Sequence, residues 1–209
     1  MRDLMQRAVL AALIIGIFAT VSNAQYLSEG AKGGFGIGVL SGNTDYDSKI
    51  GPAGRAFFRQ PLFGSGALQG ELGMTLGRIR GEAYKSNLMP VDFRLLLSPI
   101  PSESFNLFFY GGIGVLPYEN AKPLTADKNK YQLSGVVPVG AGLQFKVSDR
   151  TAFEVTGGYN LSLTDKLDVM EEGGNDSYLS LLAGFAYRLV GEDKDSDGDG
   201  LSDKLEKEL

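Results

Sequence analysis

The sequence predicts an all-β fold, an eight-stranded antiparallel up-and-down barrel of the transmembrane kind. Three observations predict it. Apolar and polar residues alternate with a period of two in stretches of about ten residues, which is typical of strands whose two faces meet different surroundings. Eight such stretches are separated by turn-rich breaks, and an even number lets a barrel start and end on one side. The connections between them alternate between short and long, the asymmetry of barrels that span a membrane.

The alternation is clearest in the second half of the chain. In "FNLFFYGGIGVL" the odd positions Phe105, Leu107 and Phe109 are apolar, whereas Asn106 and Gly112 lie on the other face. The same pattern locates the remaining strands, the first four more weakly. We expect the eight strands near residues 33–41, 52–61, 67–79, 86–98, 104–116, 130–147, 151–163 and 177–190.

The connections fall into two sets. The second, fourth and sixth are short, at 63–66, 99–103 and 148–150. The other four are longer and polar, near 42–50, 80–85, 117–129 and 164–176. We expect the four longer loops to lie together at one end of the barrel, where they could contact an extracellular ligand.

Alternation alone does not say which face points inward. A membrane barrel has its apolar face toward lipid, whereas a secreted, lipocalin-like barrel has it toward a ligand. Strands of ten or more residues match a tilted membrane crossing. Glycines also recur on the polar face, as in Gly34, Gly36 and Gly38, and small residues suit the narrow interior of an eight-stranded barrel. These features favour the membrane barrel, with its outer face against membrane lipid.

Charged residues of both signs lie in mid-strand on the same polar face. If that face lines a closed interior, the charges must pair, because an unpaired charge there is costly. We therefore expect an internal network that plugs the lumen. Its predicted members are Arg55, Glu71, Asp92, Arg94 and Glu154.

Tyrosines gather toward the predicted strand ends, where a membrane barrel carries an interfacial girdle of aromatic side chains. The expected members are Tyr118, Tyr131, Tyr159, Tyr178 and Tyr187.

The two ends of the chain differ from its middle. Residues 1–24 contain Arg2 and Arg7, a 14-residue mostly apolar run and small Ser22 and Ala24, the pattern of a secretory signal peptide. The alternative is an N-terminal anchor, but a spanning helix needs about 20 apolar residues. We therefore expect a signal peptide at 1–24, the barrel at 25–190 and an acidic tail at 191–209.

The tail contains "DSDGDGLSDKLE", in which carboxylates and a glycine have the spacing of a calcium-binding loop. Alternate carboxylates supply the hard oxygen ligands that calcium prefers, Gly200 permits the sharp turn, and the last glutamate can bind through both oxygens. The alternative is a disordered acidic linker. The predicted calcium ligands are Asp195, Asp197, Asp199, the Leu201 carbonyl, Asp203 and Glu206.

Composition excludes several classes of function. The chain has no Cys and no His, which removes disulfides, Cys/His zinc sites and Ser-His-Asp or Cys-His catalysis. No other catalytic constellation stands out, so we do not expect an enzyme. The net charge is −5 and the sequence contains no basic patch, so we do not expect a nucleic-acid partner.

Signal peptide, eight alternating strands and long loops together resemble the N-terminal membrane domain of OmpA-like outer-membrane proteins, over residues 25–190. The tail resembles a single thrombospondin type-3 calcium repeat. The resemblance implies a narrow barrel in a Gram-negative outer membrane, with both ends in the periplasm, a structural or surface-interaction role, and a calcium-binding tether. The alternative is an OmpW-like or lipocalin-like barrel that binds or passes a small apolar ligand.

Overall fold

The structure is a computed structural model and describes residues 30–44, 47–62, 67–82, 84–100, 104–120, 132–168 and 174–189. The predicted signal peptide and the acidic tail lie outside the described residues. No helix in the described part of the chain is long and apolar enough to cross a membrane. The strands are β1 (Lys32–Asn43), β2 (Ser48–Lys49), β3 (Gly51–Pro61), β4 (Leu68–Gly81), β5 (Lys85–Leu88), β6 (Val91–Ile100), β7 (Phe105–Asn120), β8 (Gln132–Lys146), β9 (Thr151–Ser162) and β10 (Ser177–Arg188).

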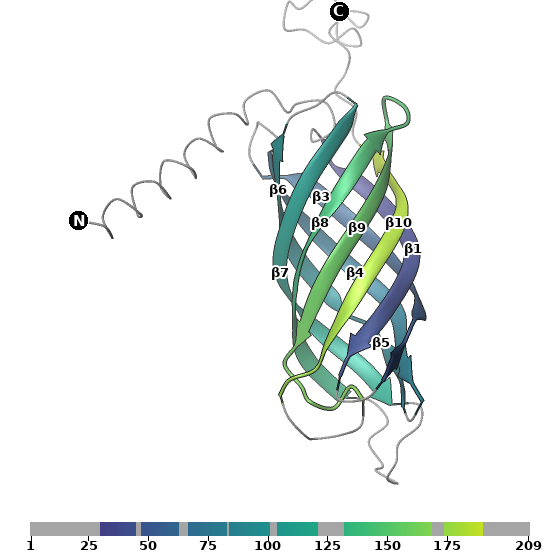
Figure 1. The fold of residues 1–209 in the computed structure, drawn as a ribbon. Coiled ribbons are helices and arrows are strands. Elements are labelled where there is room, and N and C mark those ends of the chain that lie inside the picture. Colours follow the sequence, from purple (N-terminus) through teal and green to yellow (C-terminus); the bar gives the residue numbers. More distant parts are fainter. Residues whose placement is uncertain are drawn as a thin grey trace, which may run out of the picture.

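The strands form one closed antiparallel barrel, which confirms the predicted fold (Figure 1). Each wall strand pairs with its neighbours in sequence, and β1 closes the wall by pairing with β10 from Lys32↔Arg188 to Asn43↔Ser177. Both ends of the described barrel therefore lie on the same side. Closure leaves no unpaired sheet edge, which is the condition for a sheet to cross lipid.

The ten strands form eight wall positions, here called staves. Two staves are each built from two consecutive strands, β2 with β3 and β5 with β6. Strands β5 and β6 pair with β4 in one continuous register, Gly77↔Leu88 and Met74↔Val91, and are separated at Met89 and Pro90. Pro90 has no N–H to donate to a ladder, yet its carbonyl accepts from the Thr75 N–H at 2.9 Å. Strand β2 continues β3 along β4 with a one-residue register offset.

The two faces of the wall have the predicted polarity. Large apolar side chains point outward on every stave, and the most exposed, Ile37 and Leu133, each show 72% of their surface. Most of the charged side chains in the middle of the staves are instead buried inside. This distribution is the reverse of that in a protein with a soluble exterior, where charged groups are almost never fully buried.

Glycine allows neighbouring strands and side chains to approach closely inside the barrel. A Cβ on Gly112 would collide with the backbone of Phe93 and Arg94 on β6, whereas one on the adjacent, outward-facing Gly111 would meet nothing within 4 Å. Gly73 likewise leaves the space that the Arg55 guanidinium occupies. The preference for small residues therefore applies to the inner face, as the sequence predicted.

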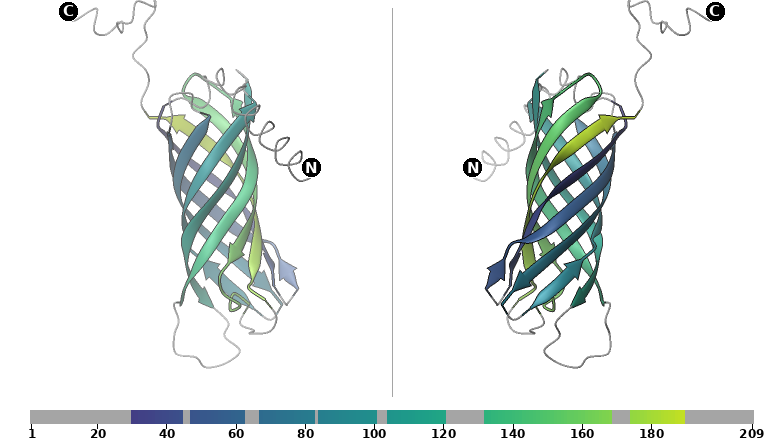
Figure 2. Two further views of the ribbon diagram at one scale, coloured as in Figure 1. Left: turned by 90° about the vertical axis from the view of Figure 1, so that its left-hand side faces the viewer. Right: turned by 90° about the vertical axis from the view of Figure 1, so that its right-hand side faces the viewer.

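The connections separate into two ends (Figure 2). Strands β3, β6 and β8 finish at the end where β1 starts and β10 finishes, whereas β1, β4, β7 and β9 finish at the other end, toward the longer connections. The strands run further into the longer loops than predicted: residues 42–43, 80–81 and 117–120 are strand. The pairing of Asn120 with Ser86 extends the wall there.

An apolar cluster occupies the lumen at the long-loop end. Its members are Leu40, Ile79, Tyr84, Leu88, Leu116, Tyr118, Val136, Leu167 and Tyr178. The predicted tyrosine girdle is therefore wrong for Tyr118 and Tyr178, because even positions on β7 and β10 face inward. Tyr187 is exposed on the outer face, Tyr159 is half-buried with its hydroxyl 2.5 Å from Ser177 Oγ, and Tyr131 lies outside the described residues.

Candidate functional site

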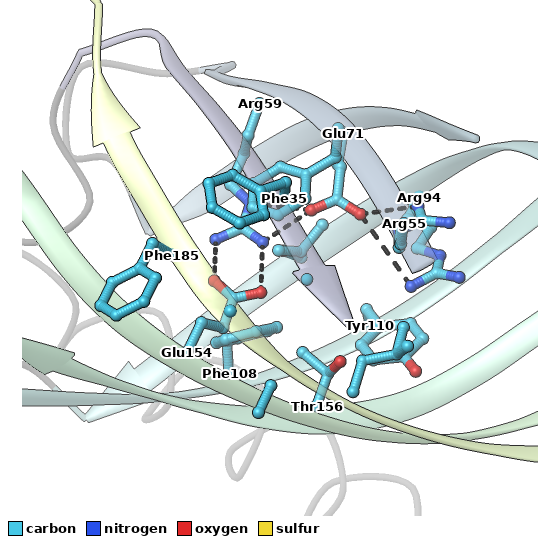
Figure 3. Close-up of a pocket in the computed structure, with 16 residues that line it drawn as sticks. Phe35, Arg55, Arg59, Glu71, Arg94, Phe108, Tyr110, Glu154, Thr156 and Phe185 are labelled. Atoms are coloured by element: carbon cyan, nitrogen blue, oxygen red, sulfur yellow. Dashed lines mark hydrogen bonds and ion pairs between the residues drawn. The ribbon is translucent and has the colours of Figure 1, made fainter. Parts of the chain in front are cut away.

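The centre of the lumen is organised around Arg59 on β3, which is 1% exposed. Its Nη2 donates to Glu71 Oε2 on β4 at 2.6 Å, and its Nε donates to the same oxygen at 3.0 Å. Its Nη1 and Nη2 donate to the two carboxylate oxygens of Glu154 on β9, each at 3.0 Å (Figure 3). Arg59 thus joins opposite walls of the barrel through charge-assisted hydrogen bonds, the strong kind.

A second guanidinium, that of Arg55, belongs to a residue two inward positions nearer the long loops on the same strand. Its Nη2 donates to Asp92 Oδ1 at 2.7 Å and its Nη1 to Asp92 Oδ2 at 2.9 Å, in a bidentate pair. The same Nη2 donates to Glu71 Oε1 at 2.9 Å. Glu71 therefore bridges Arg55 and Arg59, one carboxylate oxygen to each.

Arg94 on β6 completes the network. Its Nε lies 2.7 Å from Asp92 Oδ1, and its Nη1 lies 3.9 Å from Glu71 Oε1. The network then contains three guanidinium groups and three carboxylates, so its formal charges cancel. Every one of these six side chains is at most 8% exposed, and neutrality is what makes such burial tolerable.

Uncharged polar groups extend the network toward the short-turn end. Gln144 Nε2 donates to Glu154 Oε2 at 2.7 Å, and Asn106 Nδ2 donates to Gln144 Oε1 at 3.3 Å and to Ser98 Oγ at 3.1 Å. Glu154 thereby accepts a third hydrogen bond, and both of its oxygens have partners, as buried carboxylates require.

Aromatic rings fill the space beside the guanidinium groups. Arg59 Cζ lies 4.7 Å from the ring centre of Phe57 and 5.0 Å from that of Phe108, and Arg94 Cζ lies 4.6 Å from that of Tyr110. A ring face attracts a cation while excluding water. The planar guanidinium is suited to both contacts at once.

Little empty space remains at this level of the barrel. The cavity that Arg55, Arg59, Glu71 and Glu154 help to line has a volume of about 20 Å³, which is room for about one water molecule. The arrangement can hold the walls together, but it offers no space for a small apolar ligand.

The structure brings all five predicted network residues together, and it adds Arg59, which sequence reasoning missed. The signal was present, because Arg59 is four residues from Arg55 and so lies on the same face of the same strand. Arg59 is also close to the end of the predicted strand at 52–61.

The predicted calcium ligands of the tail lie outside the described residues, so their arrangement stays a prediction. Among the residues that the structure describes, no group of Asp and Glu side chains has the arrangement of a metal site. The ion-paired carboxylates of the lumen are already occupied by guanidinium groups.

Comparison with solved structures places the barrel among those of bacterial surface proteins. The crystal structure of Neisserial surface protein A matches with a TM-score of 0.63 at 12% identity, over 77% of this chain and 97% of that one. Ail, the attachment invasion locus protein of Yersinia pestis, matches with a TM-score of 0.51 at 14% identity, over 76% and 98%. Its complex with the heparin analogue sucrose octasulfate matches at 0.50, with 15% identity over 75% and 96%.

The likeness shows the fold. At these identities it carries neither the neighbours' ligands nor their roles to this chain. No protein-family model matches the sequence, and no curated protein matches it either.

The position of Arg59 predicts a large cost for its removal. In Arg59→Gln, Glu71 loses one guanidinium partner and Glu154 loses its only one in the network, and breaking a buried pair costs about 3–5 kcal/mol. Lys49→Gln is the control, because the Lys49–Glu82 pair is exposed, at 56% and 75% of the two side chains, and is worth about 0–1 kcal/mol. Urea unfolding in detergent micelles measures both, and equal costs for the two variants would contradict the assignment.

Proposed function

We propose that this chain is an outer-membrane β-barrel protein with a structural or surface-interaction role. One observation carries the proposal: the barrel has a polar, ion-paired interior and an apolar exterior. In a lipid bilayer both halves of that distribution are favourable, because apolar side chains meet acyl chains and the wall satisfies every backbone group internally.

The apolar outer face would be unfavourable in water. Phe35, Ile37, Leu133 and Ile113 are each more than 60% exposed, and they belong to a belt of apolar side chains on every stave. Soluble monomers rarely expose a contiguous apolar patch above a few hundred Å² (roughly 300–600 Å²). A closed wall of this kind needs lipid around it.

The fold supports an orientation as well as a location. Outer-membrane barrels have short periplasmic turns and longer extracellular loops, so the ends of β1 and β10 belong on the periplasmic side. The long connections near 42–50, 80–85, 117–129 and 164–176 would then face outward. Ail, in complex with the heparin analogue sucrose octasulfate, is an example of a barrel of this fold with a bound ligand, which supports a surface-interaction role for the long loops.

Fractionation of Gram-negative cells expressing the chain tests the proposal. We expect the protein in the outer membrane, with faster electrophoretic migration before boiling than after, because the hydrogen-bonded wall resists detergent until it is heated. A lipocalin-like carrier of an apolar ligand would instead appear in the periplasm or the medium. Recovery from those fractions without a heat-dependent shift would contradict the membrane barrel.

We also propose that the acidic tail binds calcium and acts as a periplasmic tether. The support is its sequence: the six oxygen donors Asp195, Asp197, Asp199, Leu201, Asp203 and Glu206 have the spacing of a calcium loop, and Gly200 stands where that loop turns. The negative charge of four aspartates and a glutamate favours a divalent cation, whereas the carboxylates inside the barrel are neutralised by guanidinium groups.

Calcium titration of the full chain by calorimetry tests the tail. We expect saturable binding with a Kd of about 0.1–1 mM, the range of extracellular modules. The double variant Asp197→Ala/Glu206→Ala removes two oxygen ligands and should abolish the heat, whereas Glu208→Ala removes a charge outside the loop and should leave it unaltered. No saturable heat into the millimolar range would contradict the proposal.

A further inference from the structure

Three cationic side chains stand side by side on the outer face of the barrel, at its long-loop end. Strand pairing places Lys49 of β2 opposite Arg80 of β4, and Arg80 opposite Lys85 of β5. Directly paired residues point to the same face of a sheet, and like charges in that arrangement repel one another. The sequence gives no hint of this row, because 36 positions separate its first and last members and only the barrel register aligns them.

Neighbouring acceptors neutralise the positive charge of this row only in part. Lys49 Nζ lies 3.2 Å from Glu82 Oε1, and the Nε of Arg80 donates to the Ile50 carbonyl at 3.0 Å. One step nearer the membrane centre, the Nε of Arg78 donates to Asn87 Oδ1 at 2.8 Å. Among the described residues near the row, Asp47 and Glu119 carry the other carboxylates, so four described cations stand against three described anions, and no described residue forms an ion pair with Lys85.

An apolar groove begins one outward position from this row, at Arg78 and Asn87, and lies toward the middle of the barrel wall. It has a volume of about 520 Å³ and lies where the fourth stave is interrupted at Met89. Pro52, Leu76, Met89 and Pro117 line it, and the charged side chains of Arg78 and Glu119 lie at its edge. From Arg80 to Leu76 the strand rises about 13 Å, the scale on which a lipid changes from head group to acyl chain.

We propose that this surface binds a membrane lipid with an anionic, phosphate-bearing head group. The Lys49–Arg80–Lys85 row holds the phosphate, and the groove holds an acyl chain. The inference rests on the proposed function, since it needs the barrel to lie in a bilayer. A phosphate between the three cations relieves their mutual repulsion, and the apolar groove explains why the ligand is an amphiphile rather than a free anion.

The outer face also offers an internal control for the lipid site. A second outer groove, of about 660 Å³, lies over β1, β8, β9 and β10, where Val39, Val139 and Leu181 line it without any charged side chain. It should accept acyl chains with no preference for the head group. A difference between the two grooves therefore reports on the cationic row and not on the membrane in general.

Because the chain has no Trp, Leu76→Trp and Leu181→Trp each give a single fluorescent reporter in one groove. The two variants are reconstituted in vesicles of dioleoylphosphatidylcholine containing brominated phosphatidic acid or brominated phosphatidylcholine, and quenching gives the relative association of each lipid. At position 76 we expect a preference for phosphatidic acid of about five-fold or more, from the attraction of at least one basic side chain. At position 181 we expect none.

Two further variants distinguish the effect of the cationic row from that of the protein's net charge. In the Leu76→Trp background, Arg80→Gln with Lys85→Gln should abolish the preference, whereas Arg150→Gln, on an exposed short turn at the opposite rim, should leave it unchanged. Added inorganic phosphate at 10 mM should not compete.

The outcomes that overturn the proposal are distinct. Equal quenching by the two lipids at position 76, or an unchanged preference in Arg80→Gln/Lys85→Gln, would overturn the lipid site alone. Competition by inorganic phosphate would replace it with a free-anion site. No quenching by either lipid at both positions would show that the barrel is not inserted, and would overturn the proposed function together with the site.

Discussion

The pairing of Arg59 with Glu71 and Glu154 is the constraint on which the rest of the barrel depends. Those side chains come from β3, β4 and β9, so the ion pairs tie together staves on opposite sides of the lumen. Within a closed wall there is little water to solvate a charge, and a guanidinium left alone there would cost several kcal/mol. The barrel can contain Arg59 only because two carboxylates reach it, and it can contain those carboxylates only because Arg55 and Arg94, together with Asp92, balance the remaining charge.

This arrangement determines what the wall itself must be made of. Three guanidinium groups with stacked rings of Phe57, Phe108 and Tyr110 nearly fill the bore, so neighbouring inward positions must be small, as Gly73 and Gly112 are. The large apolar residues therefore lie on the outer face and in the cluster at the long-loop end. An interior already satisfied by ion pairs leaves binding to other parts of the chain, which is why the lipid site is proposed on the outer face and ligand contacts are proposed for the loops.

The alternation of residues predicted the fold and most of the network, because period-two patterning reports directly on which face a side chain occupies. It placed Glu71, Asp92 and Glu154 inside without any knowledge of their partners. The girdle prediction was wrong for Tyr118 and Tyr178, since it rested on proximity to a strand end, which says nothing of which face a side chain occupies. The Lys49–Arg80–Lys85 row could not be predicted at all, because it depends on the register between three strands and on the offset between β2 and β3.

Planar-bilayer conductance tests most directly the central claim that paired charges fill the lumen of a membrane-inserted barrel. The wild-type protein, with insertion verified by co-flotation with the lipid, should give no stable conductance steps in 1 M KCl, because the remaining cavity of about 20 Å³ admits no hydrated ion. Stable steps from the inserted wild-type barrel would contradict the account, since they would require a continuous water-filled path past Arg59.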